Sequence, residues 1–132
     1  MKRTNISSGA KWESMVGYSR AVRIDSHIYV SGTTAFDETG NITGVGNPYQ
    51  QSVQILKNIE DALKQAGAQL KDIVRTRIYV TDIDYWQDVG KAHREFFNSI
   101  RPATTMVEVS RLIAPEILVE IEAVAVIRDG TN

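Results

Sequence analysis

The chain has 132 residues, 42% hydrophobic and 23% charged, and this length suits one domain, residues 1–132, with a single core. Its formal net charge of −1 lacks the basic footprint of nucleic-acid binding, and without cysteine it has no disulfide, zinc–thiolate site or cysteine nucleophile. No apolar run approaches the ~20 residues of a membrane span, so we expect a cytoplasmic protein with no membrane or nucleic-acid partner.

A hairpin is the first predicted unit. The segments "YSRAVRI" (18–24) and "HIYVSG" (27–32) are typical of strands, and Asp25 with Ser26 suits a two-residue turn between them. The N-terminus can supply one more short strand. The following "TTAFDETGNITGVGN" (33–47) has no sustained periodicity and predicts a long surface loop, of a kind that often borders a site.

The first long helix is predicted from the stretch "NPYQQSVQILKNIEDALKQAG". Asn47 suits the N-cap, Pro48 the first helical position, and Gly67 the end of the helix. Apolar residues recur at helical spacing and predict the face that packs on a sheet: Val53, Leu56, Ile59, Leu63 and Ala66.

The second half of the chain predicts three strands and a second helix. Strands are expected in residues 73–82, 104–112 and 117–128, and a helix capped by Asp84 in residues 84–100. The expected inner side of this helix is Trp86, Val89, His93, Phe96 and Phe97. Together with the hairpin, this order indicates the α+β class, with both helices on one face of a single sheet.

The other face of the sheet carries charge. Alternation sends Arg75, Arg77 and Tyr79 to one side of their strand and Val74, Thr76, Ile78 and Val80 to the other. In the last strand Glu120 and Glu122 separate from the apolar residues in the same way. These guanidinium and carboxylate groups could pair across the non-helical face. Periodicity alone favours a solvated face over a subunit interface.

Three stretches resemble the Rid family, the YjgF-type (RidA-like) proteins whose founding activity is 2-imino acid deamination. They are "GYSRAVRIDSHIYVSG", "AGAQLKDIVRTRIYVTDI" and "RPATTMVEVSRLIAPEILVEIEAVAV". The resemblance implies a chorismate-mutase-like fold with a mixed six-stranded sheet, a homotrimer with a central barrel, and small-molecule clefts between subunits. The charged face would then be buried near the trimer centre, where ionic groups must be paired.

One position departs from the family pattern. In relatives that deaminate imines, an arginine of the C-terminal signature binds the substrate carboxylate as a bidentate fork, and Thr104 stands there in this chain. Met106 replaces the family cysteine, whereas Tyr18 and Glu120 match the family residues. The resemblance therefore implies a divergent member for which standard 2-imino acids are poor substrates. That Thr104 merely begins a strand remains an open alternative.

By the same resemblance, Glu120 is the candidate catalytic residue, orienting or deprotonating water if burial raises its pKa. Its structural alternative is an ion pair with Arg75 or Arg77. Arg20, two residues from Tyr18, could replace the missing cation or could simply form a salt bridge with Glu108, Glu120 or Glu122.

The remaining candidate contacts are weaker. Ser31 and Gly32 lie in the strand end that lends backbone groups to the family cleft, and Trp86 could give it an apolar wall. Residues of these types in such places are more often ordinary packing residues. His27 and His93 fall on different elements, so we expect no metal site and no cofactor.

Three functions remain open. The first is hydrolysis or deamination of a reactive imine or enamine other than a standard 2-imino acid. The second is a trimer that binds or senses a small molecule without catalysis. The third is RNA cleavage, which we rank last because the charge is near neutral and the histidines are scattered.

Overall fold

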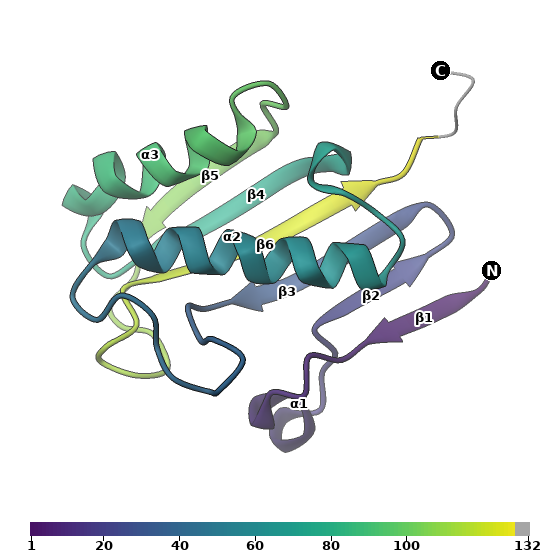
Figure 1. Ribbon diagram of the computed structural model, residues 1–132, viewed down its shortest axis with the longest axis horizontal. Helices are drawn as coiled ribbons and strands as arrows, with labels where there is room; N and C mark the ends of the chain where they lie inside the picture. Colours follow the sequence, from purple (N-terminus) through teal and green to yellow (C-terminus); the bar gives the residue numbers. More distant parts are fainter. Residues whose placement is uncertain (129–132) are drawn as a thin grey trace.

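A computed structural model of the protein describes residues 1–128, and its strands form one sheet (Figure 1). The strands are β1 (Arg3–Ile6), β2 (Ala21–Ile24), β3 (His27–Thr33), β4 (Ile73–Val80), β5 (Ala103–Glu108) and β6 (Val119–Val126). They lie in the order β1-β2-β3-β6-β4-β5. The pair β4 and β5 is parallel and the other neighbours are antiparallel, which confirms the mixed six-stranded sheet.

Two long helices, α2 (Pro48–Gln65) and α3 (Trp86–Phe97), cover one face of the sheet, as predicted (Figure 1). A shorter helix, α1 (Lys11–Val16), leads into β2 and lies at one end of the sheet. This helix was not predicted, because six residues make less than two turns and leave no periodicity to detect. Two short 3₁₀ turns, Leu70–Asp72 and Ile83–Tyr85, precede β4 and α3.

The predicted start of α2 is confirmed. The Asn47 side chain accepts a hydrogen bond from the Gln50 amide at 3.0 Å, and Pro48 is the first helical residue. Gln51 is fully buried and its amide reaches the carbonyls of Gly44 and Glu116, so it joins the loop before α2 to the loop before β6.

The predicted start of α3 was wrong. Asp82, rather than Asp84, is the cap, because its carboxylate accepts from the Asp84 amide at 2.9 Å and begins the 3₁₀ turn. The helix itself then begins at Trp86, whose side chain is 56% exposed rather than inward. Val89 and Phe97 are buried as predicted.

Alternation in β6 is confirmed, since Val119, Ile121, Ala123 and Ala125 are buried and the two glutamates lie on the opposite face. In β4 the pattern fails at one residue. A bulge between Ile73 and Arg75 turns Val74 outward, so it is 47% exposed instead of facing the helices. Ile73 takes the buried place that alternation assigns to Val74.

The non-helical face does not show the predicted pairing of arginines with glutamates. Within residues 1–128, neither Arg75 nor Arg77 forms an ion pair with Glu120 or Glu122, and both arginines are exposed. The Tyr79 hydroxyl, instead of an arginine, contacts Glu122 on this face.

Within residues 1–128, no helix has the length and apolar composition to cross a membrane.

Candidate functional site

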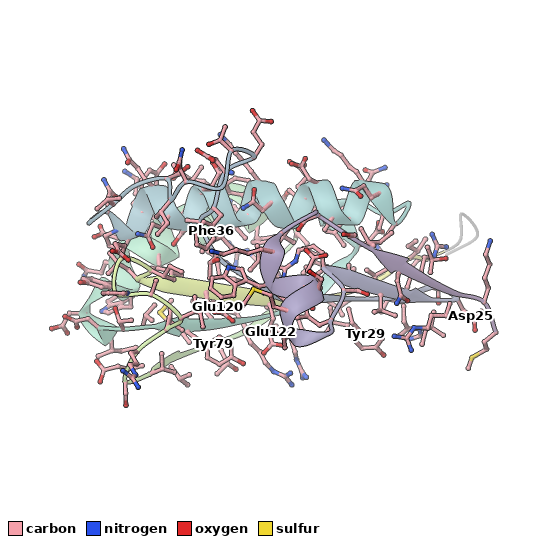
Figure 2. All side chains as sticks on the ribbon, turned by 90° about the horizontal axis from the view of Figure 1, so that it is seen from below. Asp25, Tyr29, Phe36, Tyr79, Glu120 and Glu122 are labelled. Carbon is pink, nitrogen blue, oxygen red and sulfur yellow. The ribbon has the colours of Figure 1, made fainter. Side chains whose placement is uncertain are left out.

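A cleft of about 270 Å³ opens on the face of the sheet away from α2 and α3. Figure 2 shows Tyr79 and Glu122 below the sheet while α2 lies above it. β3, β4, β6 and the loop after β5 supply the lining residues, which are Gly32, Tyr79, Val109, Arg111, Leu112, Glu120 and Glu122. The cleft therefore combines two carboxylates, a phenol, one guanidinium and a glycine.

Glu120 lies directly against Gly32. A Cβ added to Gly32 would overlap the Glu120 Oε2 atom and come within 3.0 Å of its Cδ. Burial raises the pKa of the half-buried Glu120 carboxyl, the positive charge of Arg20 acts in the opposite direction, and Glu122 adds to the rise. This carboxyl is thus more basic than a solvated glutamate, as a group that accepts a proton from water should be.

The second carboxylate is held by a tyrosine. The Tyr79 hydroxyl donates a hydrogen bond to Glu122 Oε1, and this bond raises the pKa of Tyr79. Because Glu122 is engaged in this way, Glu120 is the carboxylate of the cleft that is left without a hydrogen-bonding side chain in the described residues. The two glutamates have distinct environments although they lie on the same face of β6.

Arg20 directs its guanidinium into the protein. Its Nη1 donates to the Gly32 carbonyl at 2.9 Å and to Thr33 Oγ1 at 3.0 Å, and its Nη2 donates to the Tyr18 hydroxyl at 3.2 Å. The residue is 8% exposed. These contacts join Tyr18 and Arg20 to Gly32, which packs against Glu120, and they favour a positioning role for Arg20 over direct binding of a ligand.

Ser31 is also engaged within the hairpin. Its hydroxyl donates to the Ser19 carbonyl at 2.7 Å, and its amide donates to the Arg20 carbonyl at 3.0 Å. Its own carbonyl accepts from the Thr33 hydroxyl at 2.7 Å. Ser31 therefore helps to hold the strand end that carries Gly32.

Thr104 and Met106 lie on the opposite face of the sheet from Glu120. Thr104 pairs in register with the buried Thr76, and their hydroxyls are 2.8 Å apart. Met106 packs against the hydrophobic core. Trp86, at the start of α3, is outside the residues that line the cleft. The fold therefore separates these three predicted residues from Glu120 within one subunit.

Thr104 belongs to a small polar cluster under α3. The Thr76 hydroxyl is 2.9 Å from His93 Nε2, Thr104 Oγ1 is 3.5 Å from the same nitrogen, and the His93 ring packs on Phe97 with centroids 4.6 Å apart. Burial lowers the pKa of His93 below its ordinary value of 6.5. Burial therefore favours the neutral form of the imidazole that lies beside Thr104.

This lowered pKa predicts a stability effect. Below a pH of about 6.5, His93 is protonated in the unfolded chain, whereas in the folded protein it binds a proton only at a lower pH. The free energy of unfolding therefore falls as the pH drops towards the folded-state pKa of His93. We expect the urea midpoint to decrease with falling pH, and to decrease less in His93→Gln. His27→Gln is the control because His27 is exposed, and it should keep the wild-type pH dependence. Equal slopes in His93→Gln and wild type would contradict this prediction.

Arg111 lines the cleft, although no sequence pattern marks it. It lies in the loop after β5, and that loop is held over the end of the sheet by Gln51, whose side chain bonds Glu116 and Leu118. Contacts of this kind, far apart in sequence, leave no local pattern. In the part of the chain that the structure describes, no group of three acidic, histidine or cysteine residues could hold a metal ion.

Comparison with known proteins gives consistent matches. Residues 9–127 match the family described as Endoribonuclease L-PSP. A RutC family protein of Pyrococcus abyssi is 36% identical over 109 residues, which cover 82% of this chain and 84% of that protein. Rv2704 of Mycobacterium tuberculosis, described as a member of the YjgF/YER057c/UK114 family, is 54% identical with a TM-score of 0.86, covering 96% of this chain and 100% of that one. Escherichia coli TdcF, solved with bound serine, is 26% identical with a TM-score of 0.77, covering 84% and 88%.

Proposed function

Because the chain belongs to the Endoribonuclease L-PSP family of Rid and YjgF proteins, we propose that it hydrolyses a reactive imine or enamine in the cleft beside Glu120. The observation that carries this proposal is the Glu120 carboxyl. It is half-buried, its pKa is raised chiefly by burial, it packs against Gly32, and it lines a cleft of about 270 Å³.

In the proposed reaction Glu120 takes a proton from water as the water oxygen bonds to the imine carbon. The C=N π electrons move to nitrogen, and Glu120 gives it the proton taken from water, which yields a neutral carbinolamine. Glu120 then takes the hydroxyl proton as the carbonyl forms and passes it to the amine nitrogen as the C–N bond breaks. One imine and one water thus yield one carbonyl compound and one ammonia, with the carboxylate regenerated. An enamine enters the same route after protonation at carbon.

The substrate is predicted to differ from standard 2-imino acids. Thr104 cannot supply a bidentate fork for a carboxylate. Arg20 as a carboxylate anchor remains a prediction, and its inward hydrogen bonds weigh against it. Among the lining residues Arg111 is the one cation, and it is exposed at the cleft. A substrate that carries an anionic group would therefore meet Arg111 first.

We also propose a homotrimer in which neighbouring subunits complete the clefts. Two features support it besides the family. β5 is an edge strand with most of its residues exposed, so a second chain could cover it. Thr104 and Met106 are turned away from Glu120 of their own subunit. A shared cleft would bring them to the Glu120 of a neighbour.

The test is ammonia release above the spontaneous rate. Freshly generated aliphatic and aromatic 2-imino acids are compared with uncharged enamines of similar size, with wild-type protein at several concentrations. We expect acceleration that is proportional to protein and greater for the uncharged enamines. Faster turnover of the 2-imino acids would contradict the predicted consequence of Thr104. Absence of acceleration with every substrate would overturn the enzymatic proposal.

A second candidate, binding without turnover, is favoured by one comparison, since E. coli TdcF was solved with bound serine. Calorimetry with serine and other small amino acids would then show saturable binding while ammonia release stays at the background rate. RNA cleavage, which the family description suggests, is disfavoured by the net charge of −1. Nuclease activity that follows the protein peak on a sizing column would favour it instead.

A further inference from the structure

A buried carboxylate lies inside the N-terminal segment, away from the lining of the cleft. Glu13 of α1 is 6% exposed. Its carboxylate accepts hydrogen bonds from the Ser7 hydroxyl at 3.0 Å, from the Ser8 amide at 3.3 Å and from the Ser8 hydroxyl. The residues before α1 therefore wrap around this carboxylate and fix its position.

Glu13 is also the counter-charge of Arg20. Its Oε2 lies 3.8 Å from Arg20 Nε, which makes no hydrogen bond of its own. Within residues 1–128 this is the one ion pair, and both side chains are at most a tenth exposed. A buried guanidinium needs a partner of opposite charge, because removal from water is costly for an unpaired ion.

The other end of the guanidinium reaches the cleft. Arg20 donates to the carbonyl of Gly32 and to the hydroxyl of Tyr18, and Gly32 is the residue against which Glu120 packs. A continuous chain of contacts thus runs from Glu13 in α1 through Arg20 to the residues beside Glu120. None of these contacts depends on a second subunit.

We propose that Glu13 is a positioning residue, which acts through Arg20 to hold Gly32 in place against Glu120. It does not touch the cleft itself. Its effect on turnover rests on the proposed function of Glu120, whereas its effect on the surroundings of Glu120 does not. In this way α1 takes part in the site although none of its residues lines it.

The proposed effect of Glu13 on the Glu120 pKa has a defined direction. The charged and titratable side chains around Glu120 are Arg20, Tyr79, Arg111 and Glu122, and Tyr18 bonds the Arg20 guanidinium. Glu13 offsets the charge of Arg20, so replacing Glu13 by a neutral residue leaves more positive potential at Glu120. The ionised form of Glu120 is then favoured and its titration moves to lower pH. Removal of Arg20 must move it in the opposite direction.

The experiment is an NMR titration of the Glu120 carboxyl carbon in ¹³C-glutamate-labelled protein. We expect Glu13→Gln to lower the midpoint by about half a pH unit, and Arg20→Met to raise it. Glu38→Gln is the matched control, since Glu38 is an exposed glutamate of the loop before α2 and should leave the midpoint unchanged. The acidic limb of the pH–rate profile should move with the midpoint in each variant.

An unchanged Glu120 midpoint in folded Glu13→Gln would overturn the proposal. If that variant does not fold, Glu13→Asp keeps the charge but withdraws it by one methylene, and should lower the midpoint by a smaller amount; no shift there overturns the proposal equally. The two proposals can fail independently. If Glu13→Gln leaves the Glu120 midpoint unchanged while Glu120→Gln still abolishes turnover, only the positioning role is overturned. If Glu13→Gln shifts the midpoint while Glu120→Gln leaves turnover unchanged, only the enzymatic function is overturned.

Discussion

Replacement of Glu120 by glutamine should slow ammonia release by about 10²- to 10⁴-fold, because an amide of the same shape cannot accept a proton from water. The substitution should leave the fold intact. Glu120 makes no hydrogen bond to a side chain in the described residues, and desolvation costs its charged carboxylate more than it costs a neutral amide. A thermal midpoint at or slightly above that of the wild type is therefore expected.

The pH dependence of the wild type follows from the same carboxyl. Its ionised form is the proposed base, so the rate should fall as the pH decreases through the Glu120 pKa. Burial raises that pKa above the ordinary value of 4.5, which places the acidic limb at a higher pH than a solvated glutamate would give. Steady-state rates across the pH range measure this limb, and Glu38→Gln should reproduce it unchanged. A wild-type rate in Glu120→Gln would remove Glu120 from the mechanism.

Gly32→Ala is expected to reduce ammonia release by about the same factor as Glu120→Gln, by a different route. The added methyl would occupy the space of the Glu120 carboxylate, and only the flexible end of that side chain stands in its way. Glu120 should therefore swing out of its position while the backbone remains. The backbone at Gly32 is not in the left-handed region, so alanine adds no strain there. The thermal midpoint should fall by only a few degrees.

Gly90 offers the matched control for this substitution. It lies within α3, and a Cβ placed there meets nothing within 4 Å. Gly90→Ala should stabilise the helix by up to about 1 kcal/mol and leave the rate unchanged. A crystal structure of Gly32→Ala would show whether Glu120 has moved. Full activity in a variant with a displaced Glu120 would contradict its assignment as the base.

Much of the fold could be predicted because its main signals are local. The hairpin turn at Asp25 and Ser26, the cap and proline that begin α2, and the alternation in β6 each depend on residues adjacent in the chain. The elements that failed depend on other information. The bulge that exposes Val74 is set by the pairing of β4 with β6, and the position of Asp82 by a turn that replaces the first turn of a helix.

The site was less predictable than the fold. Alternation correctly placed Glu120, Glu122 and Tyr79 on the non-helical face, but it could not show that Tyr79 would bond Glu122 and leave Glu120 free of side-chain partners. Arg20 has no sequence signal for its partner, because Glu13 lies in a helix too short to detect. The place of Arg111 is decided by a loop that only tertiary contacts hold.

The position of β6 has a consequence for how the protein is made. This strand lies between β3 and β4, although both precede it in the sequence. Before residues 119–126 leave the ribosome, no strand connects the β2–β3 hairpin to the β4–α3–β5 unit. The edges of β3 and β4 that β6 later covers are then unpaired and can pair with strands of other chains. Glu120 arrives with the strand that joins the two halves. A nascent chain thus acquires its proposed base only at the moment the sheet is completed.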